Sequence, residues 1–323
     1  MPGSCKTPVV FIVFNRPEVT ARVFAAIRAA RPAALYLIAD GPRTEVATDA
    51  ASCAAARAAI EQIDWPCEVF RKFAPQNIGL RRNVSEGLDW VFAQAEEAII
   101  LEDDCLPDPT FFPLCEILLE RFREDEHVGV IAGTSPHQVH AAPPAGDSYR
   151  FSRYSHIWGW ATWRRAWKFY DDSMSEWPGL RDGAWLRARG LRGSAVNFWR
   201  KQFDDCYLRH SDGLDTWDVP WTFACWLNNL VSIVPRQNLV ENLGFGAEAH
   251  HTRRSSKLAG MAVVPMGSSL VHPIAVRPYE AADDWIQKKI FESATPLDRV
   301  FWALRLPIPI WLVRRVQRWL RKL

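Results

Sequence analysis

Short apolar runs alternate with longer amphipathic stretches over the first 134 residues, and this alternation constrains the fold more than any other feature of the chain. Five runs rich in apolar and β-branched residues are strand candidates, at residues 9–14, 34–39, 67–72, 98–101 and 128–132. Roughly thirty residues separate neighbouring runs, which is enough for a helical crossover between parallel strands. The pattern predicts an α/β fold in which helices flank a Rossmann-like, mainly parallel sheet.

The alternating pattern stops after Thr134. Residues 136–146 are rich in Pro, Ala and His and are typical of a loop, and an aromatic segment follows over residues 149–170. Most of the 16 tryptophans lie from position 158 onward, and we expect most of them to build a core. We therefore divide the chain into a Rossmann-like half (1–134), an irregular mixed half of the same domain (135–295) and a C-terminal helix (296–323).

Charge and cysteine content exclude several classes of protein. The formal net charge is only +2, so no global basic field favours nucleic acid as a partner. The seven cysteines are scattered without a C-x-x-C pair, which argues against a disulfide framework or a zinc site and favours a reducing compartment.

Few residues precede the first apolar run, which leaves no room for a signal peptide, and no segment has the roughly 18 apolar residues of a membrane span. We expect a cytoplasmic protein.

Polar residues follow four of the predicted strands. Ligands of open parallel sheets bind beyond the carboxyl ends of the strands, so these residues are expected to converge on one crevice. In chain order the four sets are Asn15 and Arg16; Asp40 and Arg43; Asn77, Gly79, Arg81, Arg82 and Asn83; and Glu102, Asp103 and Asp104.

The expected crevice suits a nucleotide. Asp40 can accept a hydrogen bond from a base N–H or a ribose hydroxyl, and the arginines at positions 16, 43, 81 and 82 can bind the charge of a diphosphate. A plainer interpretation is that Asn77 and Gly79 only shape a turn and that the arginines are solvated at helix starts.

Three acidic residues stand directly after the fourth apolar run. Crowded carboxylates repel one another unless a cation or solvent compensates them, so Glu102, Asp103 and Asp104 predict a divalent metal such as Mn or Mg. If the strand continues through the triplet, Glu102 and Asp104 project to one face and Asp103 to the other. We favour Asp104 as the direct ligand because it is furthest from the core. The alternative is an acidic turn that caps a helix starting near Pro109.

Together these motifs resemble GT-A-fold glycosyltransferases. The resemblance rests on the run from Phe14 to Pro17, on Asp40-Gly41, on Asn77-x-Gly79 and on the acidic triplet, and it extends to about His251. It is strongest to bacterial sugar transferases and to the N-acetylglucosaminyltransferases that start complex N-glycan branching. The resemblance implies a GT-A fold and an inverting, metal-dependent transfer of a hexosyl or N-acetylhexosaminyl group from a nucleotide-diphosphate donor, which we expect to be UDP-linked. It also assigns the metal to Asp104 and gives Glu102 and Asp103 supporting or donor-sugar roles.

Two downstream segments are similar to parts of the branching enzymes. The segment from Trp158 and Gly159 to Thr162 resembles one that precedes the catalytic segment, and its aromatic side chains can stack on a sugar or belong to the core. The segment Asp215–Trp221 resembles the one that carries the catalytic base, with Val219 where a second acidic residue would stand.

The resemblance implies that a carboxylate removes the proton of the acceptor hydroxyl. We expect Asp218 to be this base, because neighbouring tryptophans can desolvate it and raise its pKa. Asp215 is the reserve candidate. Either aspartate can instead cap the helix predicted through Trp221 and Trp226.

A glycine-containing polar stretch over residues 244–257 resembles the loop that closes over the donor in the branching enzymes. Its histidines are His250, a candidate for contact with the diphosphate, and His251, a candidate metal ligand. Both can equally be ordinary polar loop residues.

The last 28 residues have an amphipathic pattern. Ile308, Leu312, Val316 and Trp319 fall on one helical stripe that arginines flank, which suits either an anionic membrane surface or the protein's own body. Docking on the inner face of the membrane would serve an enzyme of polysaccharide biosynthesis whose acceptor is a cell-surface glycan or a lipid-linked glycan.

Two other functions remain open at the level of sequence. A nucleotidyltransferase that makes the sugar nucleotide would share the α/β half and the metal, but it would normally have a Gly-rich loop where Asn15, Arg16 and Pro17 stand. A catalytically silent carbohydrate-binding protein would keep the fold and the aromatic surface without needing the acidic triplet.

Overall fold

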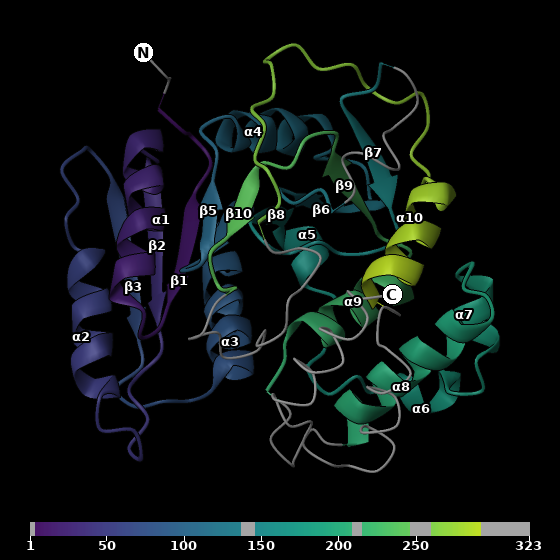
Figure 1. Cartoon of the computed structure of the whole chain (residues 1–323), viewed down its shortest axis with the longest axis horizontal. Coiled ribbons are helices and arrows are strands. Elements are labelled where there is room, and N and C mark those ends of the chain that lie inside the picture. Colours follow the sequence, from purple (N-terminus) through teal and green to yellow (C-terminus); the bar gives the residue numbers. More distant parts are fainter. Residues whose placement is uncertain (1–3, 137–145, 209–214, 246–259, 292–323) are drawn as a thin grey trace, which may run out of the picture.

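The computed structural model describes residues 4–136, 146–208, 215–245 and 260–291. Its centre is an eight-stranded sheet with the order β3-β2-β1-β4-β8-β6-β9-β7, and a second sheet pairs β10 with β5 (Figure 1). The strands are β1 Val9–Val13, β2 Ala34–Ala39, β3 Glu68–Phe73, β4 Glu97–Glu102, β5 Cys105–Pro107, β6 Val128–Ala132, β7 Tyr149–Ser152, β8 Trp160–Trp163, β9 Val231–Pro235 and β10 Val240–Asn242.

The sheet is mainly parallel, as the sequence predicts. β1 pairs in parallel with β2 and β4, β2 pairs with β3, and β6 pairs with β9. β8 runs antiparallel between β4 and β6, and β7 runs antiparallel to β9. The α/β class is therefore confirmed, and each of the five predicted strands lies within one or two residues of its predicted limits. Strands from both halves of the chain join the one sheet.

Helices cover both faces of this sheet. They are α1 Pro17–Ala30, α2 Asp49–Ala59, α3 Leu80–Phe92, α4 Phe111–Arg121, α5 Arg164–Trp167, α6 Trp177–Leu180, α7 Ala184–Ala188, α8 Ser194–Leu208, α9 Asp218–Leu227 and α10 Glu280–Ile286, followed by the π-helix η1 Gln287–Phe291. None of the helices in the described ranges is both long and apolar enough to span a bilayer.

The core has one layer on each face of the sheet, because alternate residues of a strand point to opposite faces. Val9 and Phe11 of β1 pack with α1 and α4, whereas Val10 and Ile12 pack with α3, α5 and α9. The second layer contains most of the described tryptophans, including the stacked pair Trp160 and Trp217 at 5.7 Å between ring centroids. These tryptophans are core residues, as the sequence predicts.

The parallel strands place their carboxyl ends side by side. Ile12, near the end of β1, is in register with Glu102, the last residue of β4, and Val13 is in register with Ala39 at the end of β2. The helices α1 and α3 begin just beyond these ends. This edge of the sheet is where a ligand site is expected.

Candidate functional site

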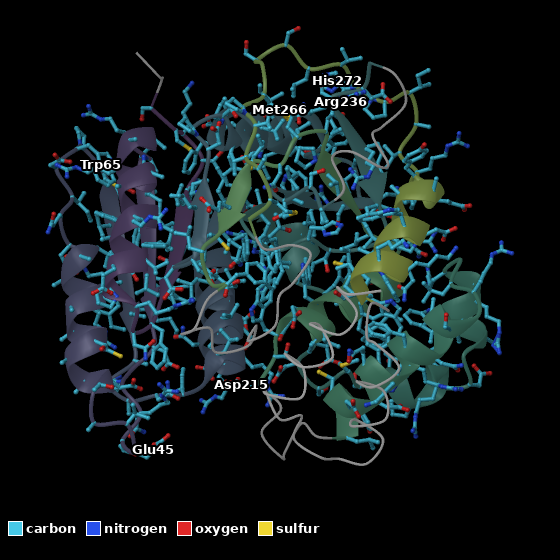
Figure 2. The ribbon with its side chains drawn as sticks, in the orientation of Figure 1. Glu45, Trp65, Asp215, Arg236, Met266 and His272 are labelled. Carbon is cyan, nitrogen blue, oxygen red and sulfur yellow. The ribbon has the colours of Figure 1, made fainter. Side chains whose placement is uncertain are left out.

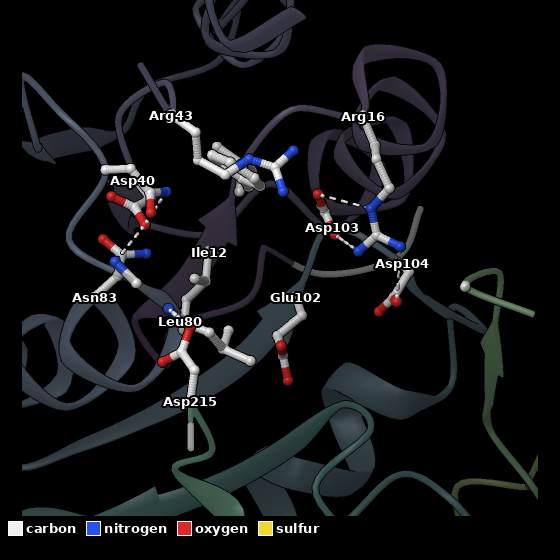
Figure 3. A pocket seen from close by; sticks show the side chains of 15 residues that line it. Ile12, Arg16, Asp40, Arg43, Leu80, Asn83, Glu102, Asp103, Asp104 and Asp215 are labelled. Atoms are coloured by element: carbon white, nitrogen blue, oxygen red, sulfur yellow. Dashed lines mark hydrogen bonds and ion pairs between the residues drawn. The ribbon is translucent and has the colours of Figure 1, made fainter. Parts of the chain in front are cut away.

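A cavity of about 360 Å³ lies at the carboxyl ends of β1, β2 and β4, beside the start of α3 (Figure 3). Its lining includes ten of the residues predicted from sequence: Arg16, Asp40, Arg43, Asn77, Gly79, Asn83, Glu102, Asp103, Asp104 and Asp215. The sheet thus brings the four strand-end motifs together.

Asp40 holds the turn that precedes α3. Its Oδ1 accepts hydrogen bonds from the N–H groups of Gly41 and Ile78 at 2.7 and 2.9 Å. Its Oδ2 accepts from Asn77 Nδ2 at 2.8 Å and from the N–H of Gly79 at 3.1 Å. Burial raises the pKa of Asp40, and the backbone hydrogen bonds oppose that rise. The carboxylate that we expected to bind a base or ribose therefore already has four donors within the protein, and the turn interpretation of Asn77 and Gly79 is correct in this respect.

Asp215 caps α3 from a distant part of the sequence. Its two oxygens accept hydrogen bonds from the N–H groups of Leu80 and Arg81, both at 2.7 Å. Figure 2 shows Asp215 at this end of α3. A Cβ at Gly79, where φ is +88°, would stand 3.2 Å from Asp215 Oδ2, so glycine leaves room for the close approach. We expected a cap for the helix through Trp221, but Asp215 caps a different helix.

The acidic triplet spans the end of a strand and the turn after it. β4 ends at Glu102, and Asp103 and Asp104 lie in the turn, so strand alternation does not continue through the triplet. Asp103 is 3% exposed and pairs with Arg16, which also donates to Asp104 Oδ2 at 3.1 Å. Arg16 therefore binds two carboxylates of the site, an arrangement that the sequence pattern did not reveal (Figure 3).

Burial and mutual repulsion perturb these acids. Burial raises the pKa of Asp103 to about 6, although Arg16 opposes the rise. The pKa of Glu102 is raised well above its ordinary value by burial and then by the charges of Asp104, Asp103 and Asp218. For Arg16, burial lowers the pKa, but the charges of Asp103 and Asp104 outweigh it and the net pKa is raised. The site is thus short of positive charge.

Asn15 and Arg43 share Asp49 as a partner. Arg43 Nε donates to Asp49 Oδ2 at 2.6 Å, and Asn15 Nδ2 donates to Asp49 Oδ1 at 2.8 Å. The hydrogen bond from Arg43 is the largest cause that lowers the pKa of Asp49, to about 2. Arg43 also lies 5.3 Å from the ring centroid of Phe14. Arg43 lines the cavity, but its charge is already paired with Asp49. Asn15 is not part of the cavity lining.

Besides Asn15, three predicted donor-site residues lie outside the cavity lining: Arg82, Trp158 and Gly159. Arg82 pairs with Glu86 one turn further along α3. The ring centroid of Trp158 lies 5.3 Å from that of Phe245. A Cβ at Gly159 would stand 2.7 Å from Cγ2 of Val240 in β10. In this structure Gly159, with φ +62°, serves the close packing of β8 against β10. His250 and His251 lie outside the described residues.

Asp218 begins α9 and lies close enough to the triplet for its charge to raise the pKa of Glu102. Its Oδ1 accepts a hydrogen bond from Thr216, and the side chain is half-buried beside the fully buried Trp217 and Trp221. It does not line the cavity itself, but it stands three residues after Asp215, which does.

Five further lining residues had no predicted contact with the ligand: Ile12, Val13, Phe14, Leu80 and Gly244. Gly244 has the clearest role, because a Cβ there would stand 2.3 Å from Asp104 Oδ2. Phe14 and Gly244 lie in motifs that the sequence already singled out. Ile12, Val13 and Leu80 are apolar positions, and no local pattern distinguishes them as site residues.

Asp104 fits a hydrated divalent ion. Its side chain is 18% exposed, and a Cβ at Gly244 would clash with Oδ2, so glycine there leaves this oxygen its present position. In the described part of the chain, no group of three or more His, Cys, Asp or Glu residues could form a complete metal site. Mg and similar ions are commonly held by one or two carboxylates together with water and substrate phosphates, and that donor set matches Asp104.

Comparisons with known proteins found only distant structural similarity. No protein-family model matches the sequence, and no curated protein matches it. Among solved structures, mouse xyloside xylosyltransferase 1 in its apo form is similar at 14% identity and a TM-score of 0.33, over 69% of this chain and 84% of that one. UDP-glucose pyrophosphorylase complexed with UDP-glucose is similar at 10% identity and a TM-score of 0.28, over 50% of this chain and 70% of that one. Such distant likeness does not identify a function.

Proposed function

We propose that this chain is an inverting, metal-dependent glycosyltransferase that transfers a hexosyl or N-acetylhexosaminyl group from a nucleotide-diphosphate donor, most simply a UDP-linked one. The observation that carries the proposal is the cavity at the carboxyl ends of β1, β2 and β4, into which the acidic triplet and two arginines project. The acceptor that we propose is a cell-surface glycan or a lipid-linked glycan.

The charge of the cavity explains why a metal is part of the proposal. Five carboxylates line it, from Asp40, Asp215 and the triplet, against the two arginines at positions 16 and 43. A diphosphate carries further negative charge and would be repelled from such a site unless a cation accompanies it. Both arginines are already paired with aspartates, so they do not supply that cation.

Asp104 would hold the ion, with water and diphosphate oxygens completing the coordination. When bound, a divalent ion supplies positive charge to the departing diphosphate. Arg16 restrains Asp104 through a hydrogen bond to Oδ2, and the absence of a side chain at Gly244 avoids a clash with that oxygen. His251 remains a proposed second ligand, and His250 a proposed contact to the diphosphate.

Asp218 is the proposed catalytic base. It would accept the proton of the acceptor hydroxyl while that oxygen attacks the anomeric carbon and the bond to the diphosphate breaks on the opposite side. Its place at the first position of α9 fixes its backbone, and Thr216 orients the carboxylate through Oδ1. Asp215, whose two oxygens are both bound to α3, is poorly suited to receive this proton.

A nucleotidyltransferase is less well supported by the site. β1 continues into α1 through Phe14, Asn15 and Arg16, with no glycine-rich loop that could bind a triphosphate. Membrane docking through residues 296–323 also remains a proposal, since that segment lies outside the described residues.

Two variants test the proposed roles. We expect Asp104→Ala to abolish Mn-dependent binding of UDP, measured by titration calorimetry, whereas Asp218→Asn retains that binding and loses transfer from a UDP-sugar. Asp182→Ala, a change on the exposed surface, is the control for both measurements. Wild-type turnover in both site variants would rule out the assignment, and release of pyrophosphate from a nucleoside triphosphate and a sugar phosphate would favour the nucleotidyltransferase.

A further inference from the structure

A second cavity, of about 720 Å³, lies in the part of the chain after residue 146 and shares no lining residue with the strand-end cavity. It is formed where the end of α7, the end of α9 and the first turn of α10 meet, and Arg153 after β7 lines it as well. Figure 1 shows α7 and α10 on the side of the molecule away from β1, β2 and β3. The volume is within the range of small-molecule sites, roughly 300 to 1,000 Å³.

The charges that line this cavity are mostly positive. Arg153, Arg189 and Arg277 contribute three cations, and Glu280 is the one acidic residue of the lining. Asp283 lies beneath the lining, fully buried, and pairs with Arg153 Nε at 3.2 Å. When Asp283 is included, the cavity still has an excess of positive charge, in contrast to the acidic strand-end site.

Arg189 is the less compensated of the two partly buried cations, Arg153 and Arg189. One of its Nη groups donates to Asn229, its Nε is buried with no hydrogen-bond partner, and its guanidinium lies 5.4 Å from the ring centroid of Trp185. Among the described residues no carboxylate pairs with it, and burial lowers its pKa. A half-buried cation without a counter-charge is costly, and an anion bound in the cavity would remove that cost.

Arg153 is fixed in place beside it. Its Nη1 donates to the carbonyl oxygen of Arg189 at 2.9 Å, and a Cβ at Gly190 would stand only 2.7 Å from the same Nη1. Glycine at this position, with φ +82°, therefore allows the guanidinium to lie against the chain. Arg277 stands exposed at the rim and has no ion pair with the described residues. Arg153 is thus held in place, and the planar guanidinium groups of these arginines match the oxygens of phosphate.

We propose that this cavity is a binding site for a phosphate-bearing ligand, separate from the donor site, with Arg189 and Arg277 as the residues that bind the phosphate group. Several guanidinium groups suit a phosphate, which has three oxygens and up to two charges to share among them. The proposal does not depend on the glycosyltransferase assignment, because it rests on a different set of residues.

Inorganic phosphate in the presence of EDTA is the probe that separates the two sites. Without a divalent ion the strand-end cavity has five carboxylates against two arginines and repels phosphate, so binding reports on the arginine-lined cavity. Binding is measured on the full chain by the broadening of the phosphorus NMR line as protein is added.

We expect saturable binding that weakens about tenfold in Arg277→Gln and at least about tenfold in Arg189→Gln. Arg22→Gln, which removes an equally exposed charge from α1, is the control and should bind as the wild type does. Circular dichroism checks the fold of each variant, and Arg277→Gln decides the question if Arg189→Gln does not fold, because Arg277 is exposed. Absence of saturable binding, or equal affinity in Arg277→Gln and Arg22→Gln, would overturn the proposal.

A competition experiment distinguishes the sources of the phosphate group. Displacement of phosphate by vesicles of phosphatidylglycerol, and not by vesicles of phosphatidylcholine, would support an anionic lipid headgroup as the ligand. Saturable phosphate binding that neither vesicle disturbs would support a soluble phosphorylated compound.

Discussion

The cap that Asp215 places on α3 connects two parts of the chain that are 135 residues apart, and Asp215→Ala removes it. Both carboxylate oxygens accept N–H groups of the first turn of α3 at 2.7 Å. These N–H groups have no partner within a helix. Loss of a capping side chain costs roughly 0.5 to 2 kcal/mol, and loss of a negative charge at a helix N-terminus costs about 0.3 to 1 kcal/mol more. Because the cap is exposed, we expect the free energy of unfolding to fall by about 1 to 2 kcal/mol.

Urea unfolding at pH 7.5, followed by circular dichroism, measures this change. The midpoint should shift while the slope with denaturant stays constant, because the native fold is kept. Asp182→Ala is the matched control, since Asp182 accepts only one N–H, from Ala184 at 2.9 Å, in the local turn before α7. We expect this control to cost less than about 1 kcal/mol.

A loss below about 0.5 kcal/mol for Asp215→Ala would refute the capping argument. Asp215→Asn provides a second check, because it keeps one acceptor oxygen and should lose about half as much stability. If Asp215 were the catalytic base, Asp215→Asn would instead abolish transfer while donor binding and stability remained at their wild-type values.

Three more substitutions follow from the site. Asp49→Asn should lower the free energy of unfolding by about 2 kcal/mol at pH 7, because the depressed pKa of Asp49 contributes stability that is present above pH 4 and lost as the pH falls towards 2. Urea unfolding of the variant and the wild type between pH 2 and 7 should therefore show a converging difference, and a constant difference would contradict this. Gly41→Ala should lower the free energy of unfolding, measured by thermal unfolding, by about 3 kcal/mol, since its Cβ would stand 2.3 Å from the backbone carbonyl carbon of Gln76. A near-neutral result would be inconsistent with that contact. Gly244→Ala should weaken Mn-dependent UDP binding at least about tenfold in titration calorimetry with an unchanged circular dichroism spectrum, because its Cβ would displace Asp104, and unchanged binding would argue against Asp104 as ligand.

The sheet was predictable from sequence because its signals are local. The buried runs of β1, β2 and β6 are apolar throughout and bounded by helical stretches, so their limits can be read from the chain. The strands β7, β8 and β9 of the same sheet were not predicted, and neither were β5 and β10. β5 and β10 have three residues each, too few to show a periodicity, and they pair with each other.

The candidate site was predictable only in part. Position at a strand end identified Asp40, Arg43 and the triplet, because the end of an apolar run is visible in the sequence. Leu80 was not identified as a lining residue, since its contribution depends on where α3 begins in space. The arginine-lined cavity left no local signal either, because Arg153, Arg189 and Arg277 come from segments far apart in the chain.

The sequence by itself determined the α/β class, the limits of five strands and which carboxylates stand at strand ends, because these follow from residue periodicity. Tertiary structure decided what each side chain does there. Asp40 binds the turn 37 to 39 residues later, Arg16 pairs with Asp103 across 87 residues, and Asp215 caps α3 across 135. Hydrogen bonds and ion pairs depend on distance in space, and a sequence pattern contains no distances between segments that meet only when the sheet has formed.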